Sequence, residues 1–297
     1  MTFDTVIIGG GIAGWQAAIQ LCRSLRRVAV IDAGGGRSSA SRGYRNLLGF
    51  PAGVSGEQLR HAGRSYATNL GAVFVQDEVI SLAQTPDRLF HLTTRSQRIL
   101  QGQTIVLATG IDDPFPQIEG LRECLGISVF ICPDCDGYEA VGKRTAVIGK
   151  EAQVAEMAKA ISYYTDQLVL LHDKSTEHQK QIARILHIDG KVAGVELESG
   201  EKIEVERIFL AYPGARVQSQ LLRSLSVQLN EKGHVLVDPR TKETSHPGIW
   251  AIGDVTVHSQ QVAIAMGDGL QAAIWIHKRL QEQSRMHQET CTAKEHT

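Results

Sequence analysis

The sequence has few of the features that mark secreted, membrane or nucleic-acid-binding proteins. Its 297 residues include only five cysteines, eight prolines and 5% aromatic residues, and the formal net charge is -1. So few cysteines do not form a disulfide framework, and a nearly neutral chain lacks the basic patch that nucleic acid or an anionic membrane requires. No run is long and apolar enough to span a bilayer. What remains is a soluble globular composition, 42% hydrophobic and 21% charged, with enough length for two domains.

The first apolar run, residues 6–19, superficially resembles a signal sequence. No basic residue precedes it and glycines interrupt it, so we interpret it as strand, turn and helix. We therefore expect a cytoplasmic protein. Charge is uneven along the chain, since residues 1–64 contain eight arginines and three acidic residues. These arginines could meet an acidic protein partner or a bound phosphate, or could simply face solvent.

A glycine-rich turn at residues 9–14 lies between a predicted strand, 3–8, and a predicted helix, 15–25. It fits the GxGxxG pattern, in which Gly9 allows the tight turn, Gly11 admits a pyrophosphate and Gly14 lets helix and strand pack closely. The anion would lie on the helix N-terminus. Asp32 follows the next predicted strand, 27–31, and is placed to hydrogen-bond a ribose hydroxyl. The pattern predicts a bound dinucleotide; the alternative is a glycine turn in an α/β unit that binds nothing.

The most reactive candidate is the sequence Cys-Pro-Asp-Cys-Asp-Gly at residues 132–137. Only two residues separate Cys132 from Cys135, so the pair can cycle between dithiol and disulfide. Half of a zinc site and an inert buried pair are the alternatives. Zinc needs four ligands and the chain has no second CxxC or spaced Cys/His pair, so a redox dithiol is favoured.

A second strand–helix–strand pattern, at 145–148, 152–164 and 168–172, repeats the architecture but not the glycines. The turn reads Gly-Lys-Glu-Ala-Gln-Val, with Glu151 where the second glycine would admit a pyrophosphate. A carboxylate there brings bulk and like charge against the ligand. The following His172-Asp173-Lys174-Ser175 has no arginine pair for a 2′-phosphate. We infer a module without ordinary NADPH binding; the alternative is a site that uses other groups.

The remaining pattern predicts mostly strands. Alternation favours strands at 73–82, 89–94 and 97–100, and apolar runs favour strands at 103–108, 207–211 and 248–254. A hairpin-like pair is expected at 192–198 and 202–206. Helices are expected at 57–70 and 262–280, and the polar tail from Gln281 is expected to fray. The prolines near residue 114 indicate the first domain boundary.

Five motifs in order resemble the low-molecular-weight thioredoxin reductase family of flavoproteins over nearly the whole chain. They are GGGIAG at 9–14, NLLGFP at 46–51, ATG at 108–110, the CxxC followed by Asp-Gly, and GIWAIGD at 248–254. The resemblance implies an α/β fold of two tandem Rossmann-like domains. The FAD domain would be discontinuous, 1–112 and 248–297, and 113–247 would be the CxxC-bearing, degenerate pyridine-nucleotide-type domain.

The resemblance also implies roles for single residues. Gly9, Gly11, Gly14 and Asp32 would hold the ADP part of FAD, Asn46 would lie near the ring and Asp254 would bind the ribityl chain, with Thr109, Gly110 and Gly253 in the same cofactor-binding set. Gln261 and Val262 would face the flavin pyrimidine edge at a helix N-terminus, whose dipole stabilises the anionic reduced ring. Cys135 would face the flavin, Cys132 would exchange with the substrate, and Asp136 would be the acid/base. For Asp136 the alternative is a helix cap beside Gly137.

The sequence departs from typical members of the family at the electron-donor site. It lacks the glycines near Glu151 and the arginines after the second strand, and it has Gln260 where an arginine is common. This pattern is similar to branches that do not use pyridine nucleotides: ferredoxin-dependent reductases, dithiol oxidases and diflavin-linked enzymes. We therefore expect a FAD-dependent disulfide oxidoreductase that does not use NADPH, with a second FAD as a further option.

The expected partners follow from the same resemblance. They are thioredoxin or a small dithiol or disulfide, ferredoxin as a candidate donor, and a second copy of the chain in a homodimer; neither nucleic acid, a membrane nor a metal is expected. The alternatives are an NADPH-dependent thioredoxin reductase and a flavin-binding redox sensor without turnover.

Overall fold

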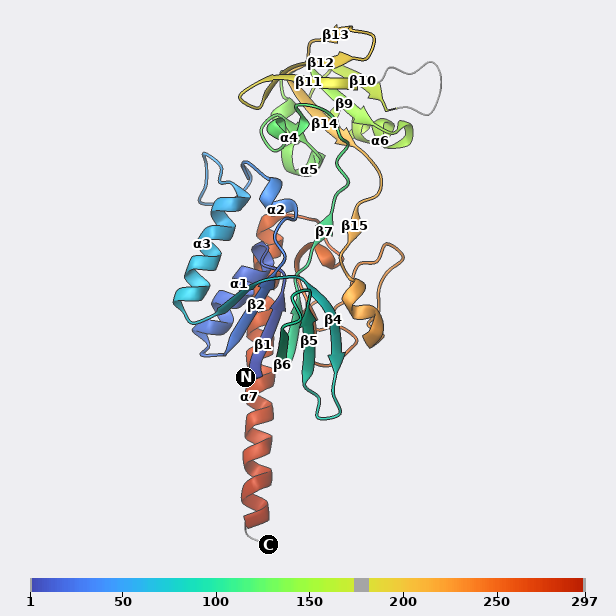
Figure 1. Cartoon of the computed structure of the whole chain (residues 1–297). Coiled ribbons are helices and arrows are strands. Elements are labelled where there is room, and N and C mark those ends of the chain that lie inside the picture. Colours follow the sequence, from blue (N-terminus) through green and yellow to red (C-terminus); the bar gives the residue numbers. More distant parts are fainter. Residues whose placement is uncertain (1, 174–181, 296–297) are drawn as a thin grey trace. The chain divides into compact units, whose positions relative to one another are not determined.

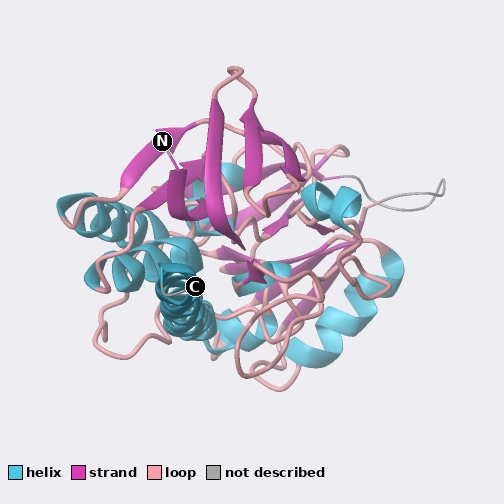
Figure 2. Ribbon diagram, turned by 90° about the horizontal axis from the view of Figure 1, so that it is seen from below, coloured by secondary structure: helices cyan, strands magenta, loops and turns pink. Residues whose placement is uncertain are grey.

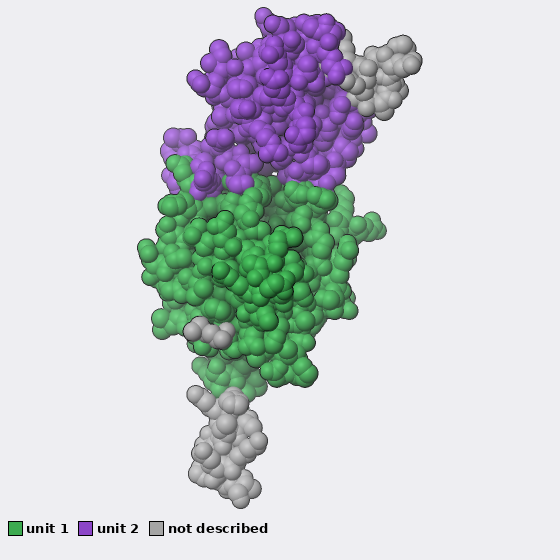
Figure 3. All heavy atoms as spheres, viewed as in Figure 1, with its two compact units in different colours: residues 1–38, 58–112, 216–297 green, residues 39–57, 113–215 purple. Residues whose placement is uncertain are grey.

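The structure is a computed structural model that describes the backbone of residues 2–173 and 182–295, with side chains through residue 286. The chain divides into two compact units (Figure 3). Unit 1 contains residues 1–38, 58–112 and 216–297, and unit 2 contains residues 39–57 and 113–215. Each unit is therefore built from stretches that are distant in the sequence.

Unit 1 is organised around one mostly parallel sheet of order β3-β2-β1-β6-β5-β4, with β16 paired to β6 (Figure 1). Strands β1, β2, β3, β6 and β16 run parallel, whereas β4 and β5 form an antiparallel extension. The strands are β1 (Thr2–Ile8), β2 (Val28–Asp32), β3 (Val73–Gln76), β4 (Val79–Gln84), β5 (Phe90–Thr94), β6 (Ile99–Leu107) and β16 (Ile249–Ala251). A separate antiparallel pair joins β7 (Ile111–Asp112) to β15 (Arg216–Val217).

Both faces of the unit 1 sheet are covered. Helices α1 (Ile12–Arg23) and α7 (Val262–Glu295) pack against each other and share one core with Ile7, Val106 and Trp250 (Figure 2). The alternating residues of the same strands face a second core that includes η2 (Gln220–Leu225). This burial on both sides is why the strands read as continuous apolar runs. The remaining helical segments are α2 (Arg37–Ala40), α3 (Gly56–Asn69) and η3 (Gly253–Val255).

Unit 2 contains a parallel sheet of order β10-β9-β14-β8 and an antiparallel sheet of order β11-β12-β13. The parallel strands are β8 (Val129–Phe130), β9 (Thr145–Gly149), β10 (Leu168–His172) and β14 (Arg207–Ala211), and the others are β11 (Ile182–Ile188), β12 (Lys191–Leu197) and β13 (Lys202–Ile203). The helices are α4 (Leu121–Cys124), α5 (Pro133–Asp136), η1 (Gly137–Ala140) and α6 (Glu151–Ile161). One core links the two sheets.

The compact units differ from the expected domains at two places. Residues 216–247 belong to unit 1, because Leu222 and Val235 pack in the same core as Val6 and Phe90. Residues 39–57 belong to unit 2, where the Arg42 backbone lies so close to Gly126 that a Cβ there would come within 2.6 Å of the Arg42 nitrogen.

Three expected strands and the expected end of the last helix need correction. The strand expected at 73–82 is two strands, β3 and β4, and those expected at 97–100 and 103–108 are one strand, β6. Gly102 does not break β6; it admits the close approach of Val6, since a Cβ would lie 2.9 Å from Val6 Cγ2. The expected hairpin is confirmed as the antiparallel pair of β12 and β13, which belongs to a three-stranded sheet that begins with β11. Helix α7 continues to Glu295 instead of fraying from Gln281, because the added residues are mostly good helix formers.

Candidate functional site

The glycine turn after β1 is shaped for close backbone packing on one side and is open on the other. Gly9 has φ +109°, and a Cβ there would lie 2.3 Å from the Ala108 carbonyl oxygen. A Cβ at Gly14 would lie 2.0 Å from the Gly9 oxygen. No described atom comes within 4 Å of a Cβ built at Gly11, which caps α1 without a side-chain hydrogen bond. The first amides of α1 can therefore receive a phosphate, so this turn fits the pyrophosphate of a dinucleotide.

Asp32 joins this turn at the end of β2. The Gly10 amide donates to Asp32 Oδ1 at 3.0 Å, and Arg60 donates to Asp32 Oδ2 at 2.8 Å. Arg60 also donates to the backbone oxygens of Gly10 and Gly35. Sequence reasoning missed this arginine, because one arginine on the polar face of α3 resembles a solvated residue. The acid predicted to meet a ribose is thus held beside the glycines.

Two further predicted segments of unit 1 come to the same place. Thr109 and Gly110 follow β6, and the Thr109 nitrogen would lie 3.1 Å from a Cβ at Gly9. At the end of β16, a Cβ at Gly253 would lie 3.0 Å from Ala13 Cβ on α1. The predicted residues at the carboxyl end of the parallel strands are therefore gathered around the start of α1, as in other α/β ligand sites.

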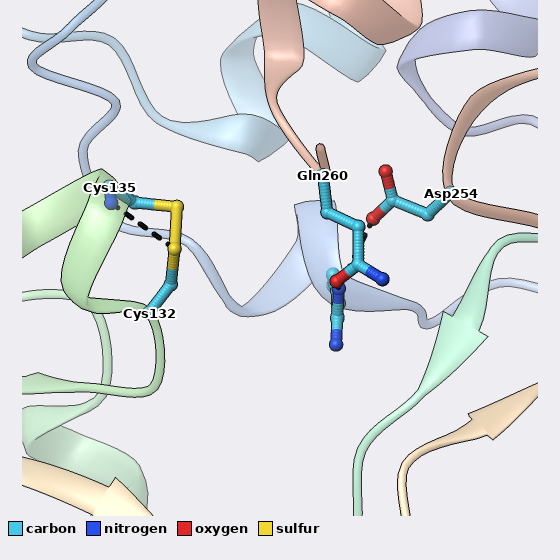
Figure 4. Close-up of a disulfide and its surroundings, with 5 residues drawn as sticks. Cys132, Cys135, Asp254 and Gln260 are labelled. Atoms are coloured by element: carbon cyan, nitrogen blue, oxygen red, sulfur yellow. Dashed lines mark hydrogen bonds and ion pairs between the residues drawn. A yellow bond between two sulfur atoms is a disulfide. The ribbon is translucent and has the colours of Figure 1, made fainter. Parts of the chain in front are cut away.

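Asp254, the next residue, is held by an arginine that the sequence analysis did not single out. Arg37 approaches Asp254 Oδ2 at 3.4 Å and donates to the Gln260 side chain (Figure 4). Gln261 caps α7, since its carbonyl oxygen accepts from the Ala265 amide at 2.9 Å, and Val262 begins the helix. Asp254, Gln260 and Gln261 thus lie on one connected segment between β16 and α7.

In unit 2, Cys132 and Cys135 form a disulfide across the start of α5, with Cα atoms 5.3 Å apart (Figure 4). Both residues are partly buried. Cys132 occupies the N-cap position, where its Sγ accepts from the Cys135 amide at 3.1 Å, and Pro133 occupies the first turn. An amide donor at a helix start favours the thiolate form of a cysteine. The first sulfur of the pair is therefore prepared to act as a nucleophile once the disulfide is reduced.

The other cysteines with described side chains are not suited to this chemistry. Cys22 and Cys124 are free and buried, and burial raises the pKa of each thiol to about 11. In the part of the chain that the structure describes, no group of three His, Cys, Asp or Glu side chains is arranged to hold a metal ion.

Asp136 directly follows the pair and has an unusual carboxyl group. Burial raises its pKa to about 6; Glu139 adds to the rise and Arg45 opposes it. Arg45 Nε lies 3.6 Å from Glu139 Oε1. Among the described contacts the Asp136 side chain makes no capping hydrogen bond to η1, so the helix-cap alternative has no support. A carboxyl group that titrates near neutrality can exchange protons with thiols.

Gly137 lets this loop pack against the end of α6. A Cβ there would lie 2.3 Å from the ring of Tyr164. Asn46 also belongs to unit 2, where it is exposed and next to Arg45 in the chain. Its predicted place near a flavin ring stays a prediction.

The second turn, after β9, packs closely against β14. A Cβ at Gly149 would lie 1.8 Å from the Ala211 oxygen, and Lys150 caps α6 while pairing with Asp173 at 3.2 Å. Glu151 begins the helix, and fully buried Val154 takes the place of the third glycine. Lys174 and Ser175, which belong to the segment where an arginine pair was looked for, lie outside the described residues. The described part of this turn lacks the open glycine that the first turn presents.

No helix within the described residues combines the length and the hydropathy needed to cross a membrane.

Comparisons with known proteins show the family to which this chain belongs. The family model described as pyridine nucleotide-disulphide oxidoreductase matches residues 3–187 and 169–269. A thioredoxin reductase of Treponema pallidum is 30% identical over 91% of this chain and 95% of its own length. A thioredoxin reductase of Mycolicibacterium smegmatis is 28% identical over 94% of this chain and 97% of its own length.

The solved structure of HlmI has a TM-score of 0.87 to this chain, with 26% identity, and covers 100% of this chain and 98% of its own. The fold matches this solved structure and the family model covers well over half of the chain, so the chain belongs to the pyridine nucleotide-disulphide oxidoreductase family.

Proposed function

We propose that this FAD-dependent disulfide oxidoreductase of the thioredoxin reductase type passes two electrons between its flavin and a thiol or disulfide substrate through Cys132 and Cys135, without NADPH. One observation carries the proposal: a partly buried disulfide at a helix start is followed directly by a carboxyl group whose pKa is raised to about 6. Such a pair has both parts that thiol–disulfide exchange needs, a stabilised thiolate and a proton carrier.

The sulfur steps follow from the positions of the two cysteines. In the reducing direction, the Cys132 thiolate attacks a substrate disulfide, forming a mixed disulfide and releasing one substrate thiolate. The Cys135 thiolate then attacks the Cys132 sulfur, which restores the internal disulfide and releases the second substrate thiolate. Two electrons pass from the dithiol to the substrate. The same steps in reverse oxidise a substrate dithiol.

Asp136 supplies or removes the protons of these steps. With a pKa near 6, its carboxyl group is mostly ionised at neutral pH but gains a proton readily. It accepts a proton when a cysteine thiol becomes a thiolate and returns it when a thiolate leaves. Its position next to Cys135 in the chain favours that sulfur as its partner.

The residues of unit 1 fit a dinucleotide cofactor. The open amides behind Gly11 would receive the pyrophosphate, Asp32 the adenosine ribose, and Asp254 with Gln261 the flavin end, while Gly9 and Gly14 keep strand and helix close. When bound, FAD accepts or donates the two electrons that the cysteine pair exchanges. Asn46, Thr109, Gly110, Gly253 and Val262 complete the proposed cofactor-binding set.

The independence from NADPH rests on the second turn. Val154 and Glu151 replace two glycines, and Lys150, beside Glu151 at the start of α6, pairs with Asp173 after β10. The relatives named thioredoxin reductase favour the alternative, a chain that does use NADPH. Thioredoxin or a small disulfide is the proposed substrate, ferredoxin a candidate donor, and a homodimer the proposed assembly, all by resemblance.

An anaerobic titration of the purified flavoprotein tests this function. NADPH and NADH are added separately while the flavin absorption band is followed, and dithionite gives full reduction. Bleaching by dithionite alone supports the proposal. Stoichiometric bleaching by NADPH overturns its NADPH-independent part and makes the chain a thioredoxin reductase of the ordinary kind.

A turnover assay separates an enzyme from a redox sensor. Repeated consumption of thioredoxin disulfide or of a small dithiol requires catalysis, whereas a sensor gives one redox event per chain. Cys135→Ser should abolish that turnover while the flavin can still be reduced. Full turnover by this variant would remove the cysteine pair from the mechanism.

A further inference from the structure

The loop that connects β16 to α7 is tied down by a buried charged cluster. Asp268 on α7 is 4% exposed. Its Oδ2 accepts from the Gly253 amide at 3.1 Å and lies 2.8 Å from His258 Nε2, while its Oδ1 lies 2.8 Å from Lys242 Nζ. We call Lys242, His258 and Asp268 the Asp268 cluster. A buried carboxylate with three donors is unusual enough to require a reason.

The contacts define the protonation state of His258. Its Nδ1 lies 2.8 Å from the Ser259 carbonyl oxygen, which can only accept a hydrogen bond. Its Nε2 faces Asp268 Oδ2, which already accepts from an amide, and the other oxygen of Asp268 faces an ammonium group. Both ring nitrogens must therefore carry hydrogen, so His258 is an imidazolium. The hydrogen bond to Asp268 raises the pKa of His258, although burial opposes this.

The backbone of Lys242 is strained, which also indicates that the Asp268 cluster has a role. Its φ is +64°, in the left-handed region that disfavours a residue with a Cβ. A glycine would relieve this strain, yet the chain has a lysine whose ammonium group reaches Asp268. Strained backbone of this kind is found where a side chain is needed at one position.

The cluster binds the segment 253–261 at two points of its backbone. Gly253 is bound through its amide, and Ser259 is bound through its carbonyl oxygen. Between and beside these points lie Asp254, Gln260 and Gln261, the residues of the proposed flavin end. No residue of the cluster belongs to that set.

We propose that Asp268, charged His258 and Lys242 are positioning residues that hold the segment 253–261 in the conformation that binds FAD. This inference rests on the proposed assignment of Asp254 and Gln261 to the cofactor. The charged and titratable neighbours that contribute to the environment of His258 are Asp254 and Asp268. Next to them lies His234, which interacts with Arg37 and Lys232 as well as with His258.

The test measures FAD affinity of refolded or cofactor-stripped full-length protein by the quenching of flavin fluorescence. Asp268→Asn should weaken FAD binding about tenfold or more, the effect of losing a charge-assisted hydrogen bond. Lys242→Gly should also weaken it, although it relieves backbone strain. A purely structural turn residue would instead gain thermal stability and keep its affinity.

His258→Gln provides the pH readout. In the unaltered protein FAD affinity should fall as the pH rises above the ordinary histidine pKa of about 6.5 and through the raised pKa of His258, because deprotonation removes one of the two ring donors. The variant should bind more weakly at low pH and show no such fall. The imidazole resonances of His258 should titrate at higher pH in the unaltered protein than in Asp268→Asn.

Arg279→Gln is the matched control, because Arg279 also pairs a cation of α7 with a carboxylate, Glu243, at 3.0 Å, but has no described hydrogen bond or ion pair to 253–261. Its FAD affinity should be unchanged. Equal affinity and equal pH dependence in all the variants would overturn the inference and leave the FAD site intact. Absence of FAD binding by the unaltered protein would instead count against the proposed function.

Discussion

At the scale of the single residue, Asp136 combines two properties that oppose each other. Burial makes ionisation of its carboxyl group costly, and Arg45 only partly offsets that cost. The group therefore titrates near neutrality instead of near its ordinary pKa. The raised pKa of Asp136 affects both the rate of turnover and the free energy of unfolding, and each effect can be measured.

The effect of Asp136 on turnover can be measured as a pH profile. Disulfide turnover by the unaltered protein should show an inflection near pH 6, the pKa of Asp136. Oxidation of a dithiol needs the carboxylate and should rise through this pH, whereas reduction of a disulfide uses the protonated form and should fall. Asp136→Asn should lose the inflection and about one to two orders of magnitude of turnover. Asp134→Asn, an exposed acid on the same short helix, is the control and should keep the profile.

For folding stability, ionisation of Asp136 is unfavourable. The folded-state pKa of Asp136 is raised, so its favourable contribution is complete below the unfolded value of 3.8 and is lost as the pH rises through about 6. Asp136→Asn should therefore stabilise the protein by about 2 kcal/mol at neutral pH, after allowance for partial solvent screening, and by almost nothing at about pH 3, below both pKa values. Urea unfolding at the two pH values measures this. An equal effect at both would show that packing, not ionisation, is responsible.

At the scale of the element, the first βα turn separates two requirements that its glycines meet. Gly14 faces backbone, whereas Gly11 faces space that no described atom fills. A methyl group at Gly14 collides with the protein. A methyl group at Gly11 collides only with a ligand.

Two alanine substitutions should therefore have different effects. Gly11→Ala, at a backbone conformation that alanine adopts without strain, should leave the thermal stability of the cofactor-free protein unchanged and weaken FAD binding at least about tenfold. Gly14→Ala should destabilise the cofactor-free protein by ~3 kcal/mol or more, because α1 must move away from β1. Similar stability for both cofactor-free variants would contradict the interpretation of the turn.

Strands were most predictable where the sequence has a continuous apolar run between polar residues. The strands at 168–172 and 207–211 are β10 and β14 without any change of boundary. Prediction failed at β6, where two strands were expected at 97–100 and 103–108: Gly102 continues the strand, and its missing side chain makes room for Val6. The positions of Arg37, Arg60 and Asp268 had no signal, since their partners are distant in the chain.

At the scale of the whole molecule, the α/β fold and the return of the chain to its first unit were predictable from repeated strand–turn–helix patterns and from the apolar strand near residue 250. The limits of the compact units were not. Residues 39–57 and 216–247 have loop-like sequences, and only their packing assigns each to a unit. Of the candidate site, the glycine turn, Asp32 and the cysteine pair were predictable because their chemistry depends on local spacing.

Burial should determine which of the cysteines react with an alkylating reagent in the folded protein. After mild reduction, iodoacetamide near neutral pH should modify Cys132 or Cys135 rapidly and Cys22 and Cys124 only after unfolding, because the buried thiols have a pKa of about 11. Peptide mass mapping before and after denaturant measures this. Rapid labelling of Cys22 in the folded protein would contradict its burial.

The pairing of β16 with β6 also determines the order in which the protein can be completed. Ile249 lies beside Ile105 in the sheet, and the main stretch of unit 2 lies between them in the chain. During synthesis, strands β1 to β6 must wait with one sheet edge and one helix-binding face uncovered until the last part of the chain has left the ribosome. Unit 2 has all its residues earlier. The sheet that carries the glycine turn is thus closed last, by a pairing of high contact order, and a protein stalled before residue 249 would expose an aggregation-prone edge.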